Sequence, residues 1–150
     1  MSDRLGHLLD LTGGDSLART RSVKLWQRIR DVQPIAEKPF EIWKVSCAPS
    51  DAPKVVAALD PRFEVRVMAD WAGGLIWVGG SSAQIGPALR QAVAGLASGF
   101  AMLVRDVSVT REKVPPFQPL TGAHYELHKR VKASFDPLGV LNYERMHEGI

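Results

Sequence analysis

The sequence contains few of the features that would place the protein in a specialised class. Its 150 residues include one cysteine, Cys47, so no disulfide can form within the chain. An unpaired thiol in an alternating apolar run is typically buried and inert. Apolar runs such as residues 74–80 are far shorter than the ~20 residues that cross a bilayer, and residues 1–20 do not resemble a signal peptide. We therefore expect a cytoplasmic protein without membrane insertion.

Neither sign of charge predominates strongly. The formal net charge is +3, from 19 basic and 16 acidic residues, and the hydrophobic fraction of 45% is ordinary for a globular protein. This composition favours a folded protein over a wholly disordered one. The basic runs at residues 18–30 and 128–132 have helical spacing, which is typical of solvated helix faces. We therefore expect no nucleic-acid partner.

The motifs of several common catalytic sites are missing. His124 and His128 are four residues apart, but Tyr125 stands where the H-E-x-x-H zinc motif needs glutamate, and two histidines do not complete a zinc site. The Gly-Ser loop at residues 78–86 has neither the P-loop ending nor the G-x-G-x-x-G order. Its exposed amides could hold a phosphate, although such loops favour Gly and Ser for conformational reasons alone. Ser81 does not lie in a G-x-S-x-G elbow. We therefore assign no catalytic residue and no metal ligand.

Hydrophobic periodicity predicts an α+β domain. Apolar alternation or continuous apolar runs predict four strands, and helical spacing predicts a helix after the first strand and another after the third. In chain order these elements are residues 41–48, 50–61, 62–70, 75–78, 83–99 and 100–106. The resulting order of strand, helix, strand, strand, helix, strand is that of a ferredoxin-like antiparallel sheet with both helices on one face. We predict this fold.

Additional N- and C-terminal helices are predicted around Trp26 and over residues 122–135. The second helix has an apolar stripe of Leu127, Val131 and Phe135. Because two crossover helices leave one sheet face bare, we expect these terminal helices, or a second copy of the domain, to cover it. Phe135 is accordingly expected to be buried.

The segment after Phe135 has the features of a turn. Pro137 disfavours the helical conformation at Asp136 and should end the helix there, and Gly139 eases the reversal of the chain. We expect Val140 and Leu141 to return to the core as a short extended segment.

A second turn is predicted between residues 70 and 74. Asp70, Trp71, Gly73 and Gly74 combine a carboxylate, a large amphipathic ring and two permissive glycines. This combination suits a tight hairpin turn or a surface that closely approaches a ligand, and the spacing alone favours the turn.

Five segments of the sequence, taken in order, carry a family resemblance. The segments are WQRIRD (26–31), IWKVSCAPSDAP (42–53), DWAGGLIWV (70–78), GFAMLVRD (99–106) and HKRVKASFDPLGVLNYERM (128–146). Together they resemble the C-terminal cap domain of FAD-linked oxidases of the vanillyl-alcohol oxidase type, with the greatest similarity to the E subunit of bacterial glycolate oxidase. The resemblance covers about residues 22–150, which implies an N-terminal extension at 1–21, a cap domain at 22–150 and no FAD-binding domain within the chain.

The final segment is the most specific. In the family it runs from a lysine through Phe-Asp-Pro to Asn-Pro-Gly-Arg-Met, and this chain has Tyr143 and Glu144 in place of the proline and glycine. Because proline fixes φ and glycine permits positive φ, this change alters how closely the tail can pass another backbone or a flavin. The resemblance implies Asn142 and Arg145 as cofactor-binding residues and Trp71 as a substrate-binding residue. The positions that agree with the family are Lys132, Phe135, Asp136, Pro137, Gly139, Asn142, Arg145 and Met146.

The resemblance also implies a function. In such enzymes FAD is held mainly by a separate N-terminal domain, and the cap shapes the substrate pocket and excludes water while the flavin accepts a hydride from a 2-hydroxy acid. We therefore expect the cap-domain portion or subunit of a glycolate-oxidase-like oxidoreductase, whether a fragment of a longer subunit or a freestanding relative. It should bind no cofactor and have no activity alone, with FAD present in the complete enzyme. Its expected partners are further copies of itself or other glycolate-oxidase-like subunits. The alternative is a freestanding ferredoxin-like interaction module with no redox activity.

Overall fold

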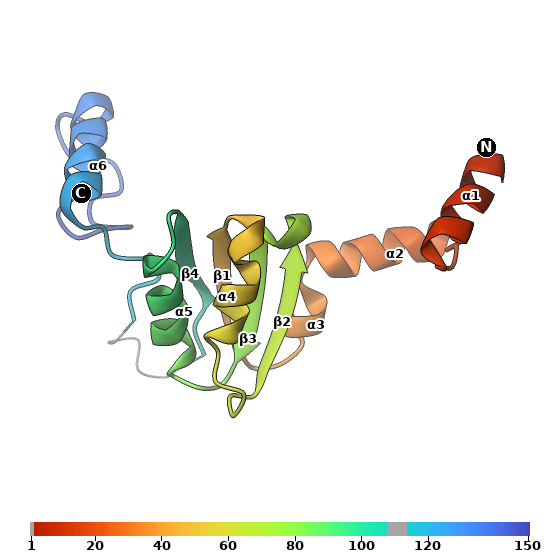
Figure 1. The fold of residues 1–150 in the computed structure, drawn as a ribbon. Helices are drawn as coiled ribbons and strands as arrows, with labels where there is room; N and C mark the ends of the chain where they lie inside the picture. Colours follow the sequence, from red (N-terminus) through yellow and green to blue (C-terminus); the bar gives the residue numbers. More distant parts are fainter. Residues whose placement is uncertain (1, 108–113) are drawn as a thin grey trace. The chain divides into compact units, whose positions relative to one another are not determined.

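The computed structural model describes residues 2–107 and 114–150 (Figure 1). The chain divides into two compact units, residues 1–34 and 35–150. The first unit contains α1 (Ser2–Thr12) and α2 (Arg19–Arg30), and α3 (Gln33–Ala36) crosses the boundary in the sequence. None of the described helices is both long and apolar enough to cross a membrane.

The second unit is an α+β domain built on a four-stranded antiparallel sheet. Its order of strand, helix, strand, strand, helix, strand agrees with the sequence prediction. The largest difference in element ends is in the second of these helices, which ends at Ala94 and not at the predicted residue 99. The elements are β1 (Glu41–Cys47), η1 (Pro49–Asp51), α4 (Ala52–Ala57), β2 (Val65–Asp70), η2 (Trp71–Gly73), β3 (Leu75–Gly80), α5 (Ile85–Ala94), β4 (Gly99–Arg105) and α6 (Gly122–Phe135).

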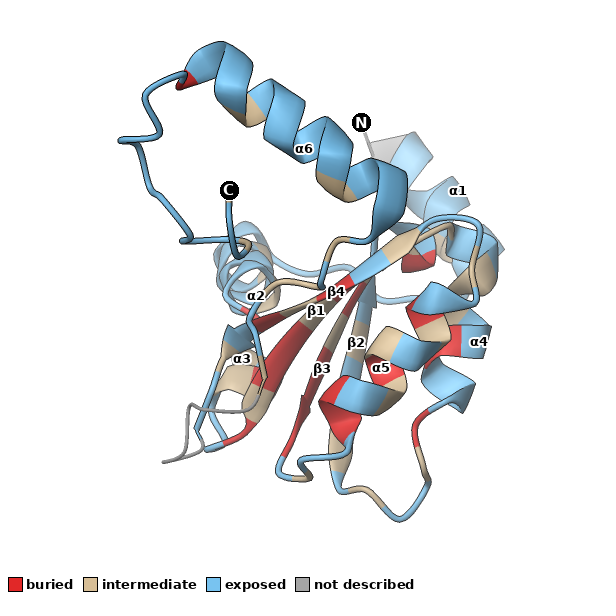
Figure 2. Ribbon diagram, turned by 90° about the vertical axis from the view of Figure 1, so that its left-hand side faces the viewer, coloured by how far each residue is buried: buried red, intermediate tan, exposed pale blue. Residues whose placement is uncertain are grey.

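The strands lie in the order β2-β3-β1-β4, and every neighbouring pair is antiparallel. β2 and β3 form the predicted hairpin, while α4 connects β1 to β2 and α5 connects β3 to β4. Both connecting helices lie on the same face of the sheet (Figures 1 and 2). The two central strands are therefore β1 and β3, and the edges are β2 and β4.

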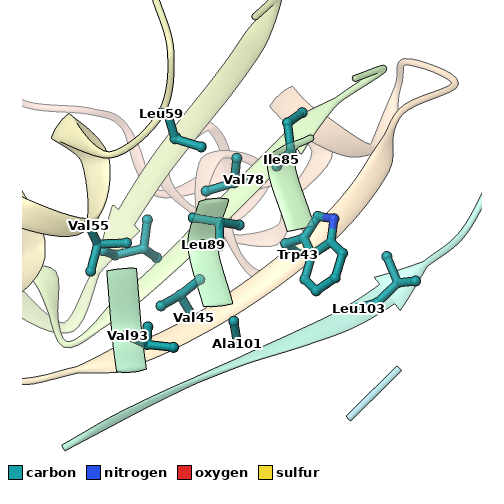
Figure 3. Close-up of a cluster of buried hydrophobic side chains, with 11 residues drawn as sticks. Trp43, Val45, Val55, Leu59, Val78, Ile85, Leu89, Val93, Ala101 and Leu103 are labelled. Atoms are coloured by element: carbon teal, nitrogen blue, oxygen red, sulfur yellow. The ribbon is translucent and has the colours of Figure 1, made fainter. Parts of the chain in front are cut away.

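The core lies between the sheet and these two helices (Figure 3). Strand alternation sends Trp43 and Val45 of β1 to this face, where they are 1% and 0% exposed. From α5, Leu89 and Val93 pack against them. The side chains of the core are Trp43, Val45, Val55, Leu59, Ile76, Val78, Ile85, Leu89, Val93, Ala101 and Leu103.

Gly86 allows α5 to approach the sheet closely. A Cβ atom at this position would lie 2.3 Å from Cζ2 of Trp43, which is closer than any real contact. Arg90, one turn further along, places its guanidinium 5.2 Å from the centre of the Trp43 ring. The same side chain donates hydrogen bonds to the carbonyls of Pro115 and Phe117. Arg90 thus connects the core helix to the segment that leads into α6.

Residues 115–118 run beside the edge strand β4. The backbone N–H of Leu103 donates to the carbonyl of Pro116 at 2.8 Å, and the N–H of Ala101 donates to Oε1 of Gln118 at 2.9 Å. These bonds satisfy amide groups that an edge strand would otherwise leave open.

The C-terminal helix corrects one expectation. α6 forms and ends at Phe135 as predicted, but none of its side chains is buried. Leu127 and Val131 are 48% and 49% exposed, and Phe135, which was expected to be buried, is 85% exposed. Val140 and Leu141 are also exposed and do not return to the core. The apolar stripe correctly located the helix, but no element of the described residues provides the surface that would bury it.

Candidate functional site

The sheet face opposite α4 and α5 carries two rows of four side chains, and each row has one residue from each of the four strands. Directly paired residues of antiparallel strands project to the same face, so the register defines each row. One row is Met68, Trp77, Lys44 and Met102, and the next is Asp70, Leu75, Ser46 and Phe100, in the strand order β2-β3-β1-β4. We call these eight residues the open face.

Lys44 lies near the middle of the open face. It belongs to the central strand β1, with Trp77 directly opposite on β3 and Met102 directly opposite on β4. Its Nζ atom lies 5.8 Å from the centre of the Trp77 ring, within the range of a cation–π contact. In the described part of the chain no carboxylate lies within ion-pair distance of this ammonium group. The open face is therefore mainly apolar and aromatic, with a cation near its centre and one carboxylate, Asp70, on the edge strand β2.

The side chains of the open face are partly accessible. Lys44, Ser46, Met68, Trp77 and Met102 are all half-buried, in contrast to the fully buried core on the other face. Phe100, at the β4 end of its row, is 39% exposed. Accessible aromatic, sulfur-containing and cationic groups on a rigid sheet can contact a ligand or a partner surface.

At one end of the open face, the next row of the sheet is partly covered by other residues. The next row beyond Lys44 contains Gly79 and Ile42, and Ile35 lies over Gly79. A Cβ atom on Gly79 would lie 2.2 Å from Cγ2 of Ile35, so glycine is needed for this close packing. Ile35 and Phe40 therefore cover this row at Gly79, whereas Arg66, at the β2 end of the same row, is exposed.

At its other end, the open face meets a cavity of about 340 Å³ between β4 and α6. Phe100 lines this cavity together with Phe117, Met146 and three histidines, His124, His128 and His147. The rings of His128 and His147 are 5.8 Å apart, and burial together with the neighbouring His128 lowers the pKa of His147. Across the described residues no group of three or more His, Cys, Asp or Glu side chains is arranged to hold a metal ion.

Trp71, the predicted substrate-binding residue, lies at the tip of the β2–β3 hairpin. Its side chain is 78% exposed, and its backbone N–H donates to Oδ1 of Asp70 at 2.7 Å. Trp71 and Ala72 have positive φ values of 53° and 54°, so this turn is locally constrained. The turn predicted from the spacing is confirmed, and the exposed ring stands at the β2 and β3 side of the sheet.

Asn142 and Arg145, the predicted cofactor-binding residues, lie in the tail after α6. The backbone N–H of Arg145 donates to the carbonyl of Asn142 at 3.1 Å, so the structure brings these two together in one turn. Both residues are exposed, and Asn142 has a φ of 49°. Trp71 follows β2, whereas this turn follows the segment beside β4, on the opposite edge of the sheet. The three predicted residues therefore do not form one cluster.

Asp136 holds the start of the tail, a role that the sequence analysis did not assign. Its carboxylate accepts the backbone N–H groups of Val140 at 3.1 Å and Leu141 at 2.8 Å, and pairs with Nζ of Lys132 at 2.8 Å. The Lys132 hydrogen bond, followed by those of Leu141 and Val140, lowers the pKa of Asp136 below its ordinary value. Asp136 is the one polar residue among the described buried side chains, at 7% exposure.

Cys47 lies at the end of β1, where its side chain is half-buried and packs against the core. Burial, with a smaller contribution from Asp51, raises the pKa of this thiol. A thiol with a raised pKa is a poor nucleophile at neutral pH. We therefore assign Cys47 no chemical role.

The sequence contained signals for both missed features. Lys44 alternates with the core residues Trp43 and Val45, so the strand pattern alone places it on the other face. The sequence does not show which residues of other strands lie beside it, because that depends on register. Asp136 stands four residues after Lys132 and directly before Pro137, and Asp in such a turn commonly accepts backbone N–H groups.

Comparisons of the chain with protein-family models, with curated proteins and with solved structures find no match.

Proposed function

We propose that this chain is the cap-domain portion or a subunit of a glycolate-oxidase-like, FAD-linked 2-hydroxy-acid oxidoreductase, in which it provides walls of the substrate pocket and contacts between subunits. The proposal starts from the five sequence segments that resemble this family. The observation that carries it is the open face, a rigid sheet surface with accessible aromatic, apolar and cationic side chains. Such a surface suits one wall of a pocket whose other wall is a planar cofactor.

We further propose that residues 41–105 form a ferredoxin-like arrangement. The strand order β2-β3-β1-β4, with all neighbouring pairs antiparallel, supports this assignment. So does the position of α4 and α5 on one face of the sheet (Figure 1). In this arrangement each connecting helix crosses over one intervening strand, which leaves the second face free for another function.

The tail residues suit only a peripheral contact with a flavin. Asn142 and Arg145 are exposed donors on a turn. Within this proposal they would contact the edge of a flavin that another domain or subunit holds, where the flavin supplies the hydride acceptor. The residues of this chain would exclude water and orient the substrate.

The test is purification of the protein from its native cells through a tag on this chain. We expect flavin absorption in the purified complex, bleaching of that absorption when a 2-hydroxy acid such as glycolate or lactate is added without oxygen, and no flavin on the chain produced alone. The matched control is the same complex with the corresponding amide, glycolamide or lactamide, which should not reduce the flavin. A complex without flavin, or one whose flavin is reduced by neither acid, would exclude the proposal.

The alternative is a protein-interaction module without redox activity. The apolar residues on α6 and the tail favour it, because Phe135 and Leu138 are 85% and 84% exposed. Apolar patches of this kind usually mark an interaction surface. A stable complex that contains no flavin would support this second function, so the same purification separates the two.

A further inference from the structure

We propose that Lys44 binds the carboxylate of a small 2-hydroxy acid on the open face, and that Trp77 fixes the position of its ammonium group. This inference rests on the function proposed above and names the residue that would recognise the substrate. Lys44 belongs neither to the turn at Trp71 nor to the tail at Asn142.

The first argument is the charge of the open face. Lys44 is half-buried between Trp77 and Met102, and among the described residues it has no anionic partner. Apolar neighbours displace water from a cation and strengthen its attraction to any anion that binds. A single lysine is a compact point charge with three donors, which suits one carboxylate.

The second argument is the position of the ammonium group. Lys44 lies on a central strand with hydrogen-bonded strands on both sides, so its backbone is among the most constrained in the domain. The contact of its Nζ atom with the Trp77 ring, at 5.8 Å from the ring centre, limits the freedom of a flexible side chain. A cation held in this way loses less entropy when an anion binds.

The third argument is the surroundings. Ser46 lies two residues further along β1 on the same face, and its hydroxyl group can donate or accept a hydrogen bond. Met68, Leu75, Phe100 and Met102 provide apolar surface around Lys44 and Ser46. The carboxylate of the open face, Asp70, lies on the edge strand β2 and accepts the backbone N–H of Trp71. This set matches a small acid with a charged carboxylate, an adjacent hydroxyl group and an apolar substituent.

The experiment is a titration of the 15N-labelled chain with mandelate, a 2-hydroxy acid with an apolar ring, followed through the indole N–H signal of Trp77. Mandelamide, which has the same shape and no charge, is the ligand control. We expect mandelate to shift the Trp77 signal and Lys44→Gln to weaken binding about tenfold, whereas Lys44→Arg retains most of it.

The matched protein control is Lys129→Gln. Lys129 also lies over an aromatic ring, with its Nζ atom 5.6 Å from the centre of the Tyr125 ring on α6. This variant should change the mandelate dissociation constant less than twofold. The dispersion of the amide signals of each variant verifies that it is folded.

Three results would overturn the inference: no shift with mandelate, equal shifts with mandelate and mandelamide, or unchanged binding in a folded Lys44→Gln variant. Its failure is distinguishable from failure of the proposed function. A flavin complex reduced by 2-hydroxy acids, combined with any of these results, leaves the function standing and removes Lys44 from it. If mandelate binding depends on Lys44 but the protein has no flavin partner, the Lys44 site stands and the proposed oxidoreductase function is excluded.

Discussion

Two helices of this protein carry similar apolar stripes but differ completely in burial. On α5, Leu89 and Val93 are spaced four residues apart and are 0% and 2% exposed. On α6, Leu127 and Val131 have the same spacing and are 48% and 49% exposed. The difference arises because α5 lies against the sheet, whereas α6 has no comparable surface beside it in the described residues. A periodic stripe thus shows which face of a helix is apolar, and only the partner surface determines whether that face is buried.

The two regions are also held together by different interactions. The sheet domain is held by apolar packing from three strands and two helices (Figure 3). The tail after α6 is held by polar contacts, chiefly the Asp136 carboxylate with two backbone N–H groups and Lys132. Tyr125 adds a hydrogen bond from its hydroxyl group to the carbonyl of Glu148 at 3.2 Å. The stability of the first region should therefore depend on side-chain volume, and that of the second on protonation and hydrogen bonding.

The largest effect is expected from removing a buried side chain of α5. Leu89→Ala should lower the free energy of unfolding by about 2–5 kcal/mol, because it removes apolar contacts and leaves a cavity in the core. Leu127→Ala is the matched control on α6 and should change that free energy by less than about 0.5 kcal/mol. Urea denaturation followed by tryptophan fluorescence measures both. Equal losses in the two variants would contradict the contrast between the helices.

The sheet domain was predictable because its signals are local and consistent. Alternation in β1 and helical spacing in α5 indicated both the elements and their buried faces, so Trp43, Val45, Leu89 and Val93 lie in the core as expected. The turn at Trp71 followed from a short stretch of Asp and Gly. The register between the strands was not predictable, because each strand has several apolar residues that could lie opposite an apolar residue of its neighbour. The row containing Lys44 and Trp77 consequently became visible only in the structure.

The C-terminal region was predictable only in its helix and turn. The residue before Pro137 ends the helix, and Gly139 has a positive φ of 64°. The prediction that Phe135 is buried was wrong, because the periodicity that placed it on the apolar stripe contains no information about a surface that could cover the stripe. The buried group is instead its neighbour Asp136, whose contacts span only four or five residues. Short-range polar contacts of this kind depend on exact turn geometry, which the sequence pattern does not determine.

A smaller, local effect is expected from titration of Asp136. Its pKa is lowered in the folded chain. The ionised carboxylate therefore contributes to the stability of the tail above the pKa of the unfolded state, and this contribution is lost as the pH falls through the lower pKa of the folded state. We expect hydrogen-exchange protection of the Val140 and Leu141 amides at neutral pH and loss of that protection in Asp136→Asn. The control is Glu126→Gln on the exposed surface of α6, which should leave both amides protected. Slow exchange of both amides in Asp136→Asn would show that the carboxylate does not hold the tail.

The smallest effect on folding is expected from Phe135→Ala, one position before Asp136. The ring is 85% exposed, so its removal should change the free energy of unfolding by less than about 0.5 kcal/mol, far below the cost of removing a buried phenylalanine. An exposed ring beside Leu138 contributes instead to association, because apolar surface left in water favours contact with another surface. Light scattering at increasing concentration should therefore show self-association in the parent chain and less of it in Phe135→Ala, while urea midpoints stay equal. A lowered midpoint with unchanged association would mean that the ring is buried in solution and that α6 packs on the domain as tightly as α5 does.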